Sequence, residues 1–499
     1  MNLYQRMLDA AGPHQDAVAF HMPDAGVRSH AELHDAVGRC ANVLIEAGVE
    51  PGDRVTVQVE KSFENVVLYL AVLRAGAVYM PLNTAYTGAE LGYFFDDAEP
   101  RVLVCDPARH AELEPLAKGA NVACTLTLAG DGSGSLTELM GGATADAPIV
   151  QRANADLAAI VYTSGTTGRS KGAMLSHGNL FANAATLRKI WGWESGDVLL
   201  HALPIYHVHG LFVALHCALL EPSPVLLLPR FDIDAVLASL PQATVLMGVP
   251  TFYVRLLADS RFDRAQCAHM RLFISGSAPL LPETFAAFEN RTGKRILERY
   301  GMTEAGMIAS NPLKGERVAG TVGYPLPDVD VRLRSPDGDT VESGGIGVLE
   351  IRGPNVFQGY WRQPERTAEE FRDGWFITGD LASQAADGRI SIVGRHKDLI
   401  ISGGLNIYPR EIELELDQLP GIEESAVIGV PHADFGEAVV ALVVTRDDWP
   451  GEAAVIAKLR HRLAAFKVPR TVMRIDQLPR NAMGKVQKAI LRKHYADAL

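Results

Sequence analysis

A polar segment about a third of the way along the chain has the composition of a phosphate-binding loop. It runs from Thr163 to Lys171 within the sequence YTSGTTGRSKG, after an apolar stretch at residues 157–162 that predicts a buried strand. Glycines let a backbone approach an anion closely, and hydroxyls, N–H groups and a lysine donate hydrogen bonds to its oxygens. The segment is not a Walker A loop, because the pattern GxxxxGK[ST] does not fit and residues 173–176 after it predict a strand. A polar hairpin turn is the alternative interpretation.

Two more predicted strands end in residues that suit a nucleotide. Segment 270–280 reads MRLFISGSAPL, and the small residues 277–279 after its strand would let a flat ring approach the backbone. The strand predicted at residues 296–302 leads to Glu304, a carboxylate suited to binding Mg²⁺ near a phosphate loop. Ligands gather at the carboxyl ends of strands in α/β sheets, so we expect these turns to face one crevice.

Residues 199–209, LLHALPIYHVH, place two histidines after an apolar strand. Either His207 or His209 taken alone could be an ordinary buried histidine. Their position beside a strand end favours the wall of a pocket. No further Cys or His stands at a spacing that would complete a zinc site.

The C-terminal quarter holds further polar candidates. Asp380, in TGD, is placed to accept hydrogen bonds from a ribose diol, although Gly-Asp is also common in surface turns. The charged, glycine-rich residues 392–406 resemble a linker between domains. A small α+β unit is predicted from about residue 396. Near its end Lys485 stands on a turn, a position where lysines are usually solvated.

The elements that would position these residues alternate between strand and helix. Residues 54–60 alternate in polarity and predict a strand. Ser62 can cap a helix that runs to about Ala75, and apolar runs at residues 78–82 and 101–105 predict further strands. The alternation predicts α/β layering. Residues 131–147 are rich in Gly, Ser and Ala and predict a surface loop.

Composition limits the classes of protein. The chain has 499 residues, 47% hydrophobic and 21% charged, which is enough for a large core and more than one domain. A net charge of −12 argues against a general nucleic-acid surface. Five cysteines without CxxC spacing suggest reduced thiols. No apolar run has the length of a membrane helix, and the N-terminus does not resemble a signal or transit peptide, so we expect a cytoplasmic protein.

The motifs YTSGTTGRSKG, YGMTE, TGD, GRHKD and PRNAMGK occur in an order and spacing that resembles the adenylate-forming superfamily of acyl-CoA synthetases, adenylation domains and luciferases. The resemblance covers essentially the whole chain. It implies a large N-terminal α/β domain of several subdomains at residues 1–395 and a small mobile C-terminal α+β domain at residues 396–499, hinged at Lys397. It also implies two reactions, in which a carboxylate attacks the α-phosphate of ATP and a thiol, expected to be that of CoA, then displaces AMP.

The resemblance assigns roles to individual residues. The ATP phosphates would be held by Thr163, Ser164, Gly165, Thr166, Thr167, Gly168 and Lys171. Adenine and ribose would be held by Ser277, Ala278, Pro279, Glu298, Arg299, Tyr300, Gly301, Met302, Thr303, Asp380 and Arg395. The catalytic residues would be Lys485, Thr303, Glu304 and His207, with Glu304 as the Mg²⁺ ligand and Lys485 bridging the attacking carboxylate and the α-phosphate. After domain rotation, Gly403 and Gly404 would line the CoA channel.

An arginine directly before YGMTE bears on the identity of the acid. Arg299 would be expensive to bury in an acyl pocket without a counter-charge, and a second carboxylate on the substrate would supply one. Arg255, after VPTFYV, could approach the same space, and paired arginines suit a carboxylate. The alternative is that Arg299 pairs with Glu298 or another internal acid.

The wider pattern, including HALPIYHVHGLF, VLMGVPTFY and LERYGMTE, resembles the malonyl-CoA synthetases, or malonate–CoA ligases. This implies malonate as substrate, with methylmalonate as a second, and contacts from Arg255, Ser277 and Arg299 to its distal carboxylate. Other short acids, an adenylation enzyme that loads a carrier protein, a luciferase-like oxidase and a nucleotide-binding regulator are the alternatives. Enzymes that acylate or deacylate Lys485 are possible partners.

Overall fold

The fold is described from a computed structural model of the chain, which describes residues 1–23, 25–163, 170–335, 338–342, 344–402, 405–432, 436–463, 465–481 and 484–496. The chain forms two compact units. The first contains Met1–Asp330 and Arg352–Gly374, and the second contains Val331–Ile351 and Trp375–Leu499. The domain boundary expected between residues 395 and 396 lies within the second unit and stays a prediction.

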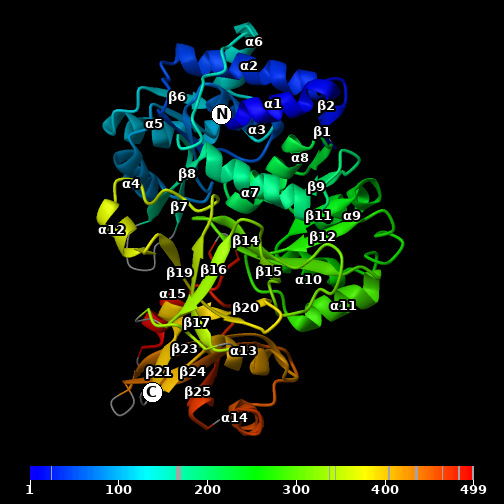
Figure 1. The fold of residues 1–499 in the computed structure, drawn as a ribbon, viewed down its shortest axis with the longest axis vertical. Helices are drawn as coiled ribbons and strands as arrows, with labels where there is room; N and C mark the ends of the chain where they lie inside the picture. Colours follow the sequence, from blue (N-terminus) through cyan, green and yellow to red (C-terminus); the bar gives the residue numbers. More distant parts are fainter. Residues whose placement is uncertain are drawn as a thin grey trace. The chain divides into compact units, whose positions relative to one another are not determined.

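The larger sheet of the first unit is parallel through its centre and antiparallel at both edges (Figure 1). Its strands, in spatial order, are β15 (Tyr324–Pro325), β14 (Gly306–Ser310), β13 (Ile296–Met302), β12 (Leu272–Ser275), β11 (Val245–Gly248), β9 (Leu199–His201), β10 (Val225–Leu227), β1 (Val18–Met22) and β2 (Gly26–Ser29). The central strands are fully buried, as expected of a parallel sheet covered on both faces.

A second sheet of the same unit carries the strands on either side of the predicted phosphate loop. Its order is β6 (Cys124–Thr127), β5 (Val102–Cys105), β3 (Arg54–Gln58), β4 (Val78–Pro81), β7 (Leu157–Thr163) and β8 (Lys171–Ser176). The pairing is parallel from β6 to β7, and β8 returns antiparallel to β7. The strand predicted after the loop is therefore confirmed as β8.

Helices connect and cover these strands. They are α1 (Leu3–Ala11), α2 (His30–Glu46), α3 (Phe63–Arg74), α4 (Gly88–Ala98), α5 (His110–Gly119), α6 (Ser135–Gly142), α7 (His177–Ile190), α8 (His216–Leu220), α9 (Ile233–Ser239), α10 (Pro250–Ala258), α11 (Pro282–Thr292) and α12 (Pro364–Glu369). The Ser62 side chain accepts the Asn65 N–H at the start of α3, which confirms the predicted cap. A π-helix at His209–Leu215 leads into α8. This mixture of helices and parallel strands is the α/β layering that the sequence predicts.

The prediction of a surface loop at residues 131–147 is wrong in its middle. Helix α6 occupies Ser135–Gly142, and its Leu136 and Met140 side chains are buried four residues apart on one face. The helix packs against α2. Burial of these two side chains outweighs the weak helical preference of the surrounding glycines and serines.

The second unit contains two smaller sheets. One contains β16 (Asp330–Arg334), β17 (Ile346–Arg352), β19 (Trp375–Gln384) and β20 (Ile390–Arg395), and the other contains β22 (Leu405–Ile407), β21 (Ile400–Ser402), β24 (Gly436–Thr445), β23 (Ile422–His432) and β25 (Thr471–Arg474). Helix α13 (Pro409–Asp417) lies between β22 and β23 in the chain, α14 (Glu452–Arg460) lies between β24 and β25, and α15 (Lys488–His494) follows β25. Strands and helices in this order confirm the α+β character predicted for the end of the chain. Within the described residues, no helix is both long and apolar enough to cross a bilayer.

A buried histidine ties α1 to α7. Nδ1 of His177, at the start of α7, accepts the Leu3 N–H at 3.1 Å, so this nitrogen must be deprotonated. Burial, with a smaller effect from Arg152, lowers the pKa of His177 to about 4 from an ordinary value of 6.5.

We predict that acid weakens the fold partly through His177. As the pH falls from about 6.5 to about 4, the unfolded chain takes up a proton that the folded chain does not, so this residue lowers the free energy of unfolding by about 1.4 kcal/mol per pH unit. His177→Asn keeps an acceptor but cannot titrate. Denaturant unfolding at several pH values between 7 and 4 should show that the free energy of unfolding falls less steeply with falling pH in this variant than in the wild type. An equally steep fall in the two proteins would contradict the assignment.

Candidate active site

The described ends of the predicted phosphate loop are held by the β7–β8 ladder. Thr163 pairs with Lys171 in its register. Ser164, Gly165, Thr166, Thr167 and Gly168 lie outside the described residues. The Lys171 side chain is largely buried, and its Nζ lies 3.2 Å from Oε1 of Glu370 and 4.6 Å from the centre of the Tyr360 ring. The predicted phosphate lysine thus points into a polar cluster of the first unit.

The predicted metal ligand lies in the same cluster. Glu304 is 7% exposed in the turn between β13 and β14, beside the half-buried Thr303. Tyr360 Oη donates to Glu304 Oε1 at 3.1 Å, and the Phe357 N–H donates to the Glu304 carbonyl at 2.7 Å. Tyr360 therefore touches both Glu304 and Lys171, which the sequence placed in separate motifs.

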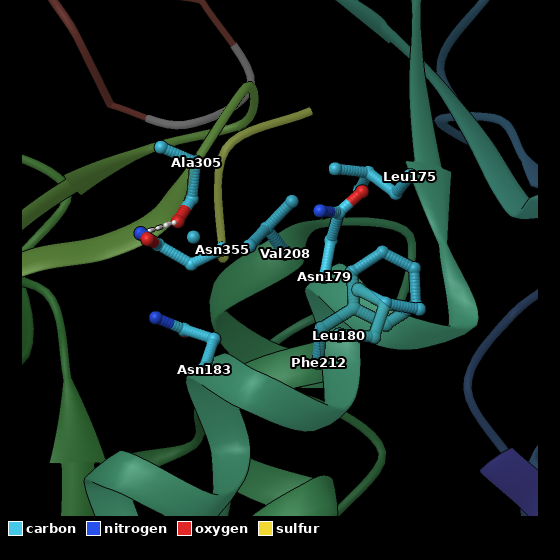
Figure 2. A pocket seen from close by; sticks show the side chains of 9 residues that line it. Leu175, Asn179, Leu180, Asn183, Val208, Phe212, Ala305 and Asn355 are labelled. Atoms are coloured by element: carbon cyan, nitrogen blue, oxygen red, sulfur yellow. Dashed lines mark hydrogen bonds between the residues drawn. The ribbon is translucent and has the colours of Figure 1, made fainter. Parts of the chain in front are cut away.

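Two asparagines fix the turn that carries Glu304. Asn183 on α7 accepts the Met307 N–H at 3.0 Å and donates to the Met307 carbonyl at 2.9 Å. Asn355 Nδ2 donates to the Ala305 carbonyl at 2.8 Å, as Figure 2 shows. Gly306 has a φ of +59°, and a Cβ there would lie 2.6 Å from Asn183 Oδ1, so the turn requires glycine. The asparagines and the turn line a cavity of only about 10 Å³ (Figure 2), too small for a substrate.

A second cluster surrounds Arg299 on β13. Arg299 is 3% exposed, and its Nε and Nη2 atoms have no hydrogen-bond partner in the described part of the chain. Glu298 Oε1 accepts the Leu280 N–H at 3.0 Å, and successive side chains of a strand point to opposite faces. Among the residues that the structure describes, no acidic side chain forms an ion pair with Arg299. Burial lowers the pKa of Arg299 to about 9, so the guanidinium remains charged at neutral pH.

Ser277 and His209 form a hydrogen-bonded pair near this cation. Ser277 Oγ lies 3.2 Å from His209 Nδ1, and Ser277 has a φ of +70°, an uncommon conformation for a non-glycine residue that often marks a functional turn. Burial, followed by the charge of Arg299, holds the pKa of His209 well below its ordinary value. The imidazole is therefore neutral at physiological pH. The sequence predicts His209 only as part of a pocket wall, and its hydrogen bond with Ser277 is visible only in the structure.

The strand and loop before His209 are held by a buried lysine. Lys61 Nζ contacts His201 Nδ1 at 3.2 Å and the carbonyls of His201 and Leu203 at 3.1 and 2.8 Å. His201 Nε2 lies 2.9 Å from the Gly210 carbonyl. His207, the histidine predicted to be catalytic, is half-buried, with its ring 4.5 Å from that of Tyr206.

The other residues predicted around adenine and the acid differ in exposure. Ala278, Tyr300, Gly301 and Met302 are half-buried, and Pro279 is exposed. Arg255 is also exposed on α10, whose buried residues are Tyr253 and Leu256. Its predicted contact with the acid stays a prediction.

The predicted ribose pair is assembled within the second unit. Asp380 on β19 lies opposite Arg395 on β20, and Arg395 Nε lies 2.6 Å from Asp380 Oδ1. The Asp380 N–H donates to Thr378 Oγ1 at 3.1 Å, which fixes the backbone of this strand. The structure therefore brings together two residues from separate motifs, TGD and GRHKD.

The predicted hinge residue and the lysine predicted to be catalytic also lie in the second unit. Lys397 is exposed in a 3₁₀ turn at His396–Asp398, and its carbonyl accepts Arg492 Nη1 from α15 at 3.1 Å. Lys485 is exposed, and its N–H donates to Asn481 Oδ1 at 3.0 Å. Gly403 and Gly404 lie outside the described residues.

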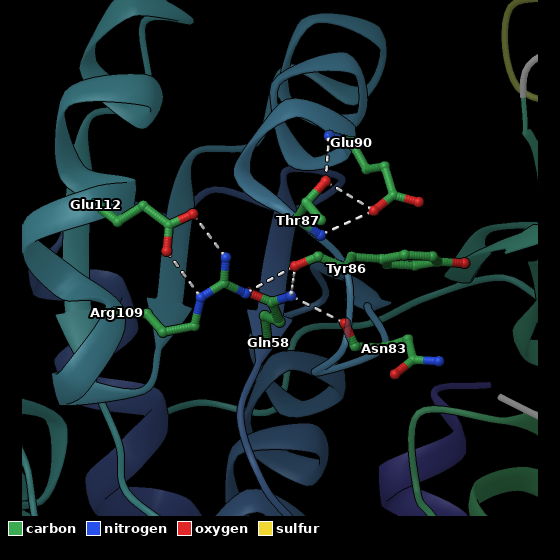
Figure 3. Close-up of polar contacts among 7 residues, drawn as sticks. All are labelled: Gln58, Asn83, Tyr86, Thr87, Glu90, Arg109 and Glu112. Atoms are coloured by element: carbon green, nitrogen blue, oxygen red, sulfur yellow. Dashed lines mark hydrogen bonds and ion pairs between the residues drawn. The ribbon is translucent and has the colours of Figure 1, made fainter.

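A polar network closes the carboxyl ends of β3, β4 and β5 (Figure 3). Arg109 donates to Gln58 Oε1 at 2.7 Å and to the Tyr86 carbonyl at 2.8 Å, and it forms an ion pair with Glu112. Gln58 Nε2 donates to the Asn83 carbonyl at 2.9 Å. These partners pin the loop at residues 83–87, and no residue of the predicted site belongs to this network.

Comparison with known proteins identifies the class. The AMP-binding enzyme family matches residues 8–361, and the AMP-binding enzyme C-terminal domain matches residues 411–485. Feruloyl-CoA synthase from an Amycolatopsis species is 38% identical over 476 residues, covering 94% of this chain and 94% of its own. The mitochondrial malonate–CoA ligase of Xenopus laevis is 35% identical over 491 residues, which cover 89% of this chain and 83% of the ligase. The crystal structure of ATP-bound MatB from Rhodopseudomonas palustris matches with a TM-score of 0.97 at 52% identity. The match covers 100% of this chain and 99% of the MatB chain.

The chain belongs to the AMP-binding enzyme family, which confirms the predicted adenylate-forming fold and the resemblance to its acyl-CoA synthetases, malonate–CoA ligases among them. It is an AMP-forming acid–CoA ligase whose small-molecule substrates are an acid, ATP and CoA. Two features of its site were not found in the sequence, Tyr360 and the partner of Ser277. The only local signal for Tyr360 is an aromatic pair after a glycine, which is too common to be specific.

We predict that Gly276→Ala disturbs Arg299 directly. A Cβ at this position would lie 2.4 Å from the Arg299 Cζ, and the guanidinium is too buried to move into water. Overpacking of this kind should lower the free energy of unfolding by about 1–3 kcal/mol. Gly196→Ala is the matched control, since nothing lies within 4 Å of its Cβ. Equal denaturation midpoints for the two variants would show that Arg299 is not fixed against Gly276.

Proposed function

We propose that this chain ligates malonate to CoA. A malonate oxygen attacks the α-phosphorus of ATP and pyrophosphate leaves, which gives malonyl-AMP. The CoA thiolate then attacks the acyl carbon and AMP leaves. Methylmalonate, which keeps the second carboxylate, is a further substrate of the same site.

Arg299 is the observation that carries the choice of acid. A buried cation whose Nε and Nη2 have no described partner is costly unless a ligand supplies the counter-charge. The distal carboxylate of malonate supplies it, and Ser277 and His209 offer hydrogen bonds beside it. Arg255 is the second arginine that we assign to this carboxylate.

The relatives support malonate but also raise an alternative. Malonate–CoA ligases of Xenopus laevis, mouse and Arabidopsis are 34–36% identical to the chain. Feruloyl-CoA synthase, at 38%, favours an aromatic acid. Ferulate has no second carboxylate and would leave Arg299 without a counter-charge, so we rank it below malonate.

The nucleotide roles follow the clusters. We assign Lys171 and the loop before it to the β- and γ-phosphates, residues 277–279 and Tyr300 to adenine, and the Asp380–Arg395 pair to the ribose. Glu304 would hold Mg²⁺, which fits a site built from one protein carboxylate and substrate phosphates and would neutralise charge on those phosphates. Thr303 and His207 are assigned to the reacting end of the acid.

We assign the first half-reaction to Lys485 and the change between the two half-reactions to a hinge at Lys397, with Gly403 and Gly404 lining the CoA channel afterwards. Arg492, which holds the Lys397 carbonyl, gives the hinge turn a defined geometry. The exposure of Lys485 also suits modification by lysine-acylating and deacylating enzymes.

The direct test is AMP release from wild-type protein with malonate, methylmalonate, acetate, butyrate and ferulate, with and without CoA. We expect malonate to give the highest kcat/KM. In Arg299→Ala, kcat/KM for malonate should fall on the order of a hundred-fold or more, since breaking a buried charge pair costs about 3–5 kcal/mol. Butyrate turnover should stay unchanged or improve.

Arg295→Ala is the matched control for this variant, because Arg295 is exposed and pairs with Glu289. It should leave both acids unaffected. A parallel fall for malonate and butyrate in Arg299→Ala would mean that the arginine only supports the fold. Higher kcat/KM for ferulate than for malonate would favour the aromatic alternative.

We predict that Lys485→Ala nearly abolishes malonyl-AMP formation and largely spares the attack of CoA on preformed malonyl-AMP. The reason is that its charge is needed where the carboxylate approaches the phosphate, and not in the second step. Each half-reaction is measured separately, with Lys493→Ala, an exposed lysine on α15, as control. Equal losses in the two half-reactions would contradict the assignment.

A further inference from the structure

Tyr360 lies between two groups that the sequence does not connect. It is 5% exposed, its Oη donates to Glu304 Oε1 at 3.1 Å, and its ring centre lies 4.6 Å from Lys171 Nζ. One end of the side chain therefore orients a carboxylate while its face attracts an ammonium group.

The backbone around Tyr360 is fastened on both sides. The Met174 N–H donates to the Gly359 carbonyl at 3.0 Å, and the Trp361 N–H donates to the Gly172 carbonyl at 2.8 Å, so the segment pairs with β8 directly after the phosphate loop. The Phe357 N–H holds the Glu304 carbonyl from the same segment. Residues 357–361 thus link the strand that carries Lys171 to the turn that carries Glu304.

The charged groups around Tyr360 also include Glu370 and Arg366. Lys171 forms an ion pair with Glu370, and Glu370 also forms an ion pair with Arg366 at 3.0 Å. Tyr360 contacts both Lys171 and Glu304 and so connects the two residues.

We infer that Tyr360 is a positioning residue that fixes the separation of Lys171 and Glu304 for a metal-bound triphosphate. Its hydroxyl orients the Glu304 carboxylate that would hold the cation, and its ring attracts the Lys171 ammonium that would bind the phosphates. The inference rests on the roles proposed for Lys171 and Glu304, and it is independent of which acid is ligated. AMP lacks the β- and γ-phosphates, so its binding should not depend on Tyr360.

Two variants separate the hydroxyl from the ring. In full-length protein, calorimetry would measure ATP binding without metal, Mg²⁺ binding at saturating ATP, and AMP binding. Tyr360→Phe should weaken the apparent Mg²⁺ affinity about ten-fold, as loss of a residue that orients a metal ligand does, and leave the other two unchanged. Tyr360→Leu should in addition weaken metal-free ATP by about two- to five-fold, because the ring no longer attracts Lys171.

Tyr86→Phe is the matched control, because Tyr86 contributes its backbone carbonyl to the network of Figure 3 and its hydroxyl points away from that network. It should change none of the three affinities. Glu304→Gln serves as the reference for metal binding. If it weakens Mg²⁺ binding while Tyr360→Phe does not, the inference about Tyr360 is overturned and the role of Glu304 stands.

If Glu304→Gln leaves Mg²⁺ binding unchanged, the proposed role of Glu304 fails and the coupling through Tyr360 fails with it. An equal loss of AMP and ATP affinity in Tyr360→Phe would show a purely structural tyrosine and would also overturn the inference. Thermal unfolding of each variant confirms that the measured protein is folded.

Discussion

A buried positive charge on β13 is the constraint on which the proposed acid site depends. Arg299 is almost fully enclosed, and Gly276 is required beside it because any larger residue would occupy the space of the guanidinium. Glu298, its neighbour in sequence, points to the other face of the strand and binds the Leu280 N–H. Strand alternation thus separates the arginine from the nearest acid in the chain and leaves its charge available to a ligand.

The same strand leads into the turn that carries Glu304, so the proposed acid site and the proposed phosphate site share one element. The turn is held by asparagines from α7 and from the segment after β17, and by Tyr360. Helix α7 follows β8, the strand that begins with Lys171. Helix α7 therefore joins β8 to the Glu304 turn through Asn183, which suits a site where the two groups are proposed to meet one triphosphate.

In the second unit, too, short connections hold together residues from separate motifs. The antiparallel register of β19 and β20 places Asp380 opposite Arg395, and Arg492 on α15 holds the turn that follows β20. The Asp380–Arg395 pair, the turn at residues 396–398 and helix α15 are therefore joined through contacts between neighbouring residues. A change in the backbone at Lys397 would alter the hydrogen bond between its carbonyl and Arg492 on α15.

The sequence by itself determined several buried strands of the two larger sheets, the start of helix α3 and the class of chemistry. Strand β13 and the Ser62 cap of α3 follow from patterns only a few residues long, and the five motifs identify the family because their chemistry is local. Helix α6 was missed, because two buried side chains outweighed its glycines and serines. Only the tertiary structure decided that Arg299 has no described acid partner, that His209 pairs with Ser277 and that Tyr360 joins Lys171 to Glu304. Each of these depends on which distant segments pack together, and short-range sequence patterns do not encode that choice.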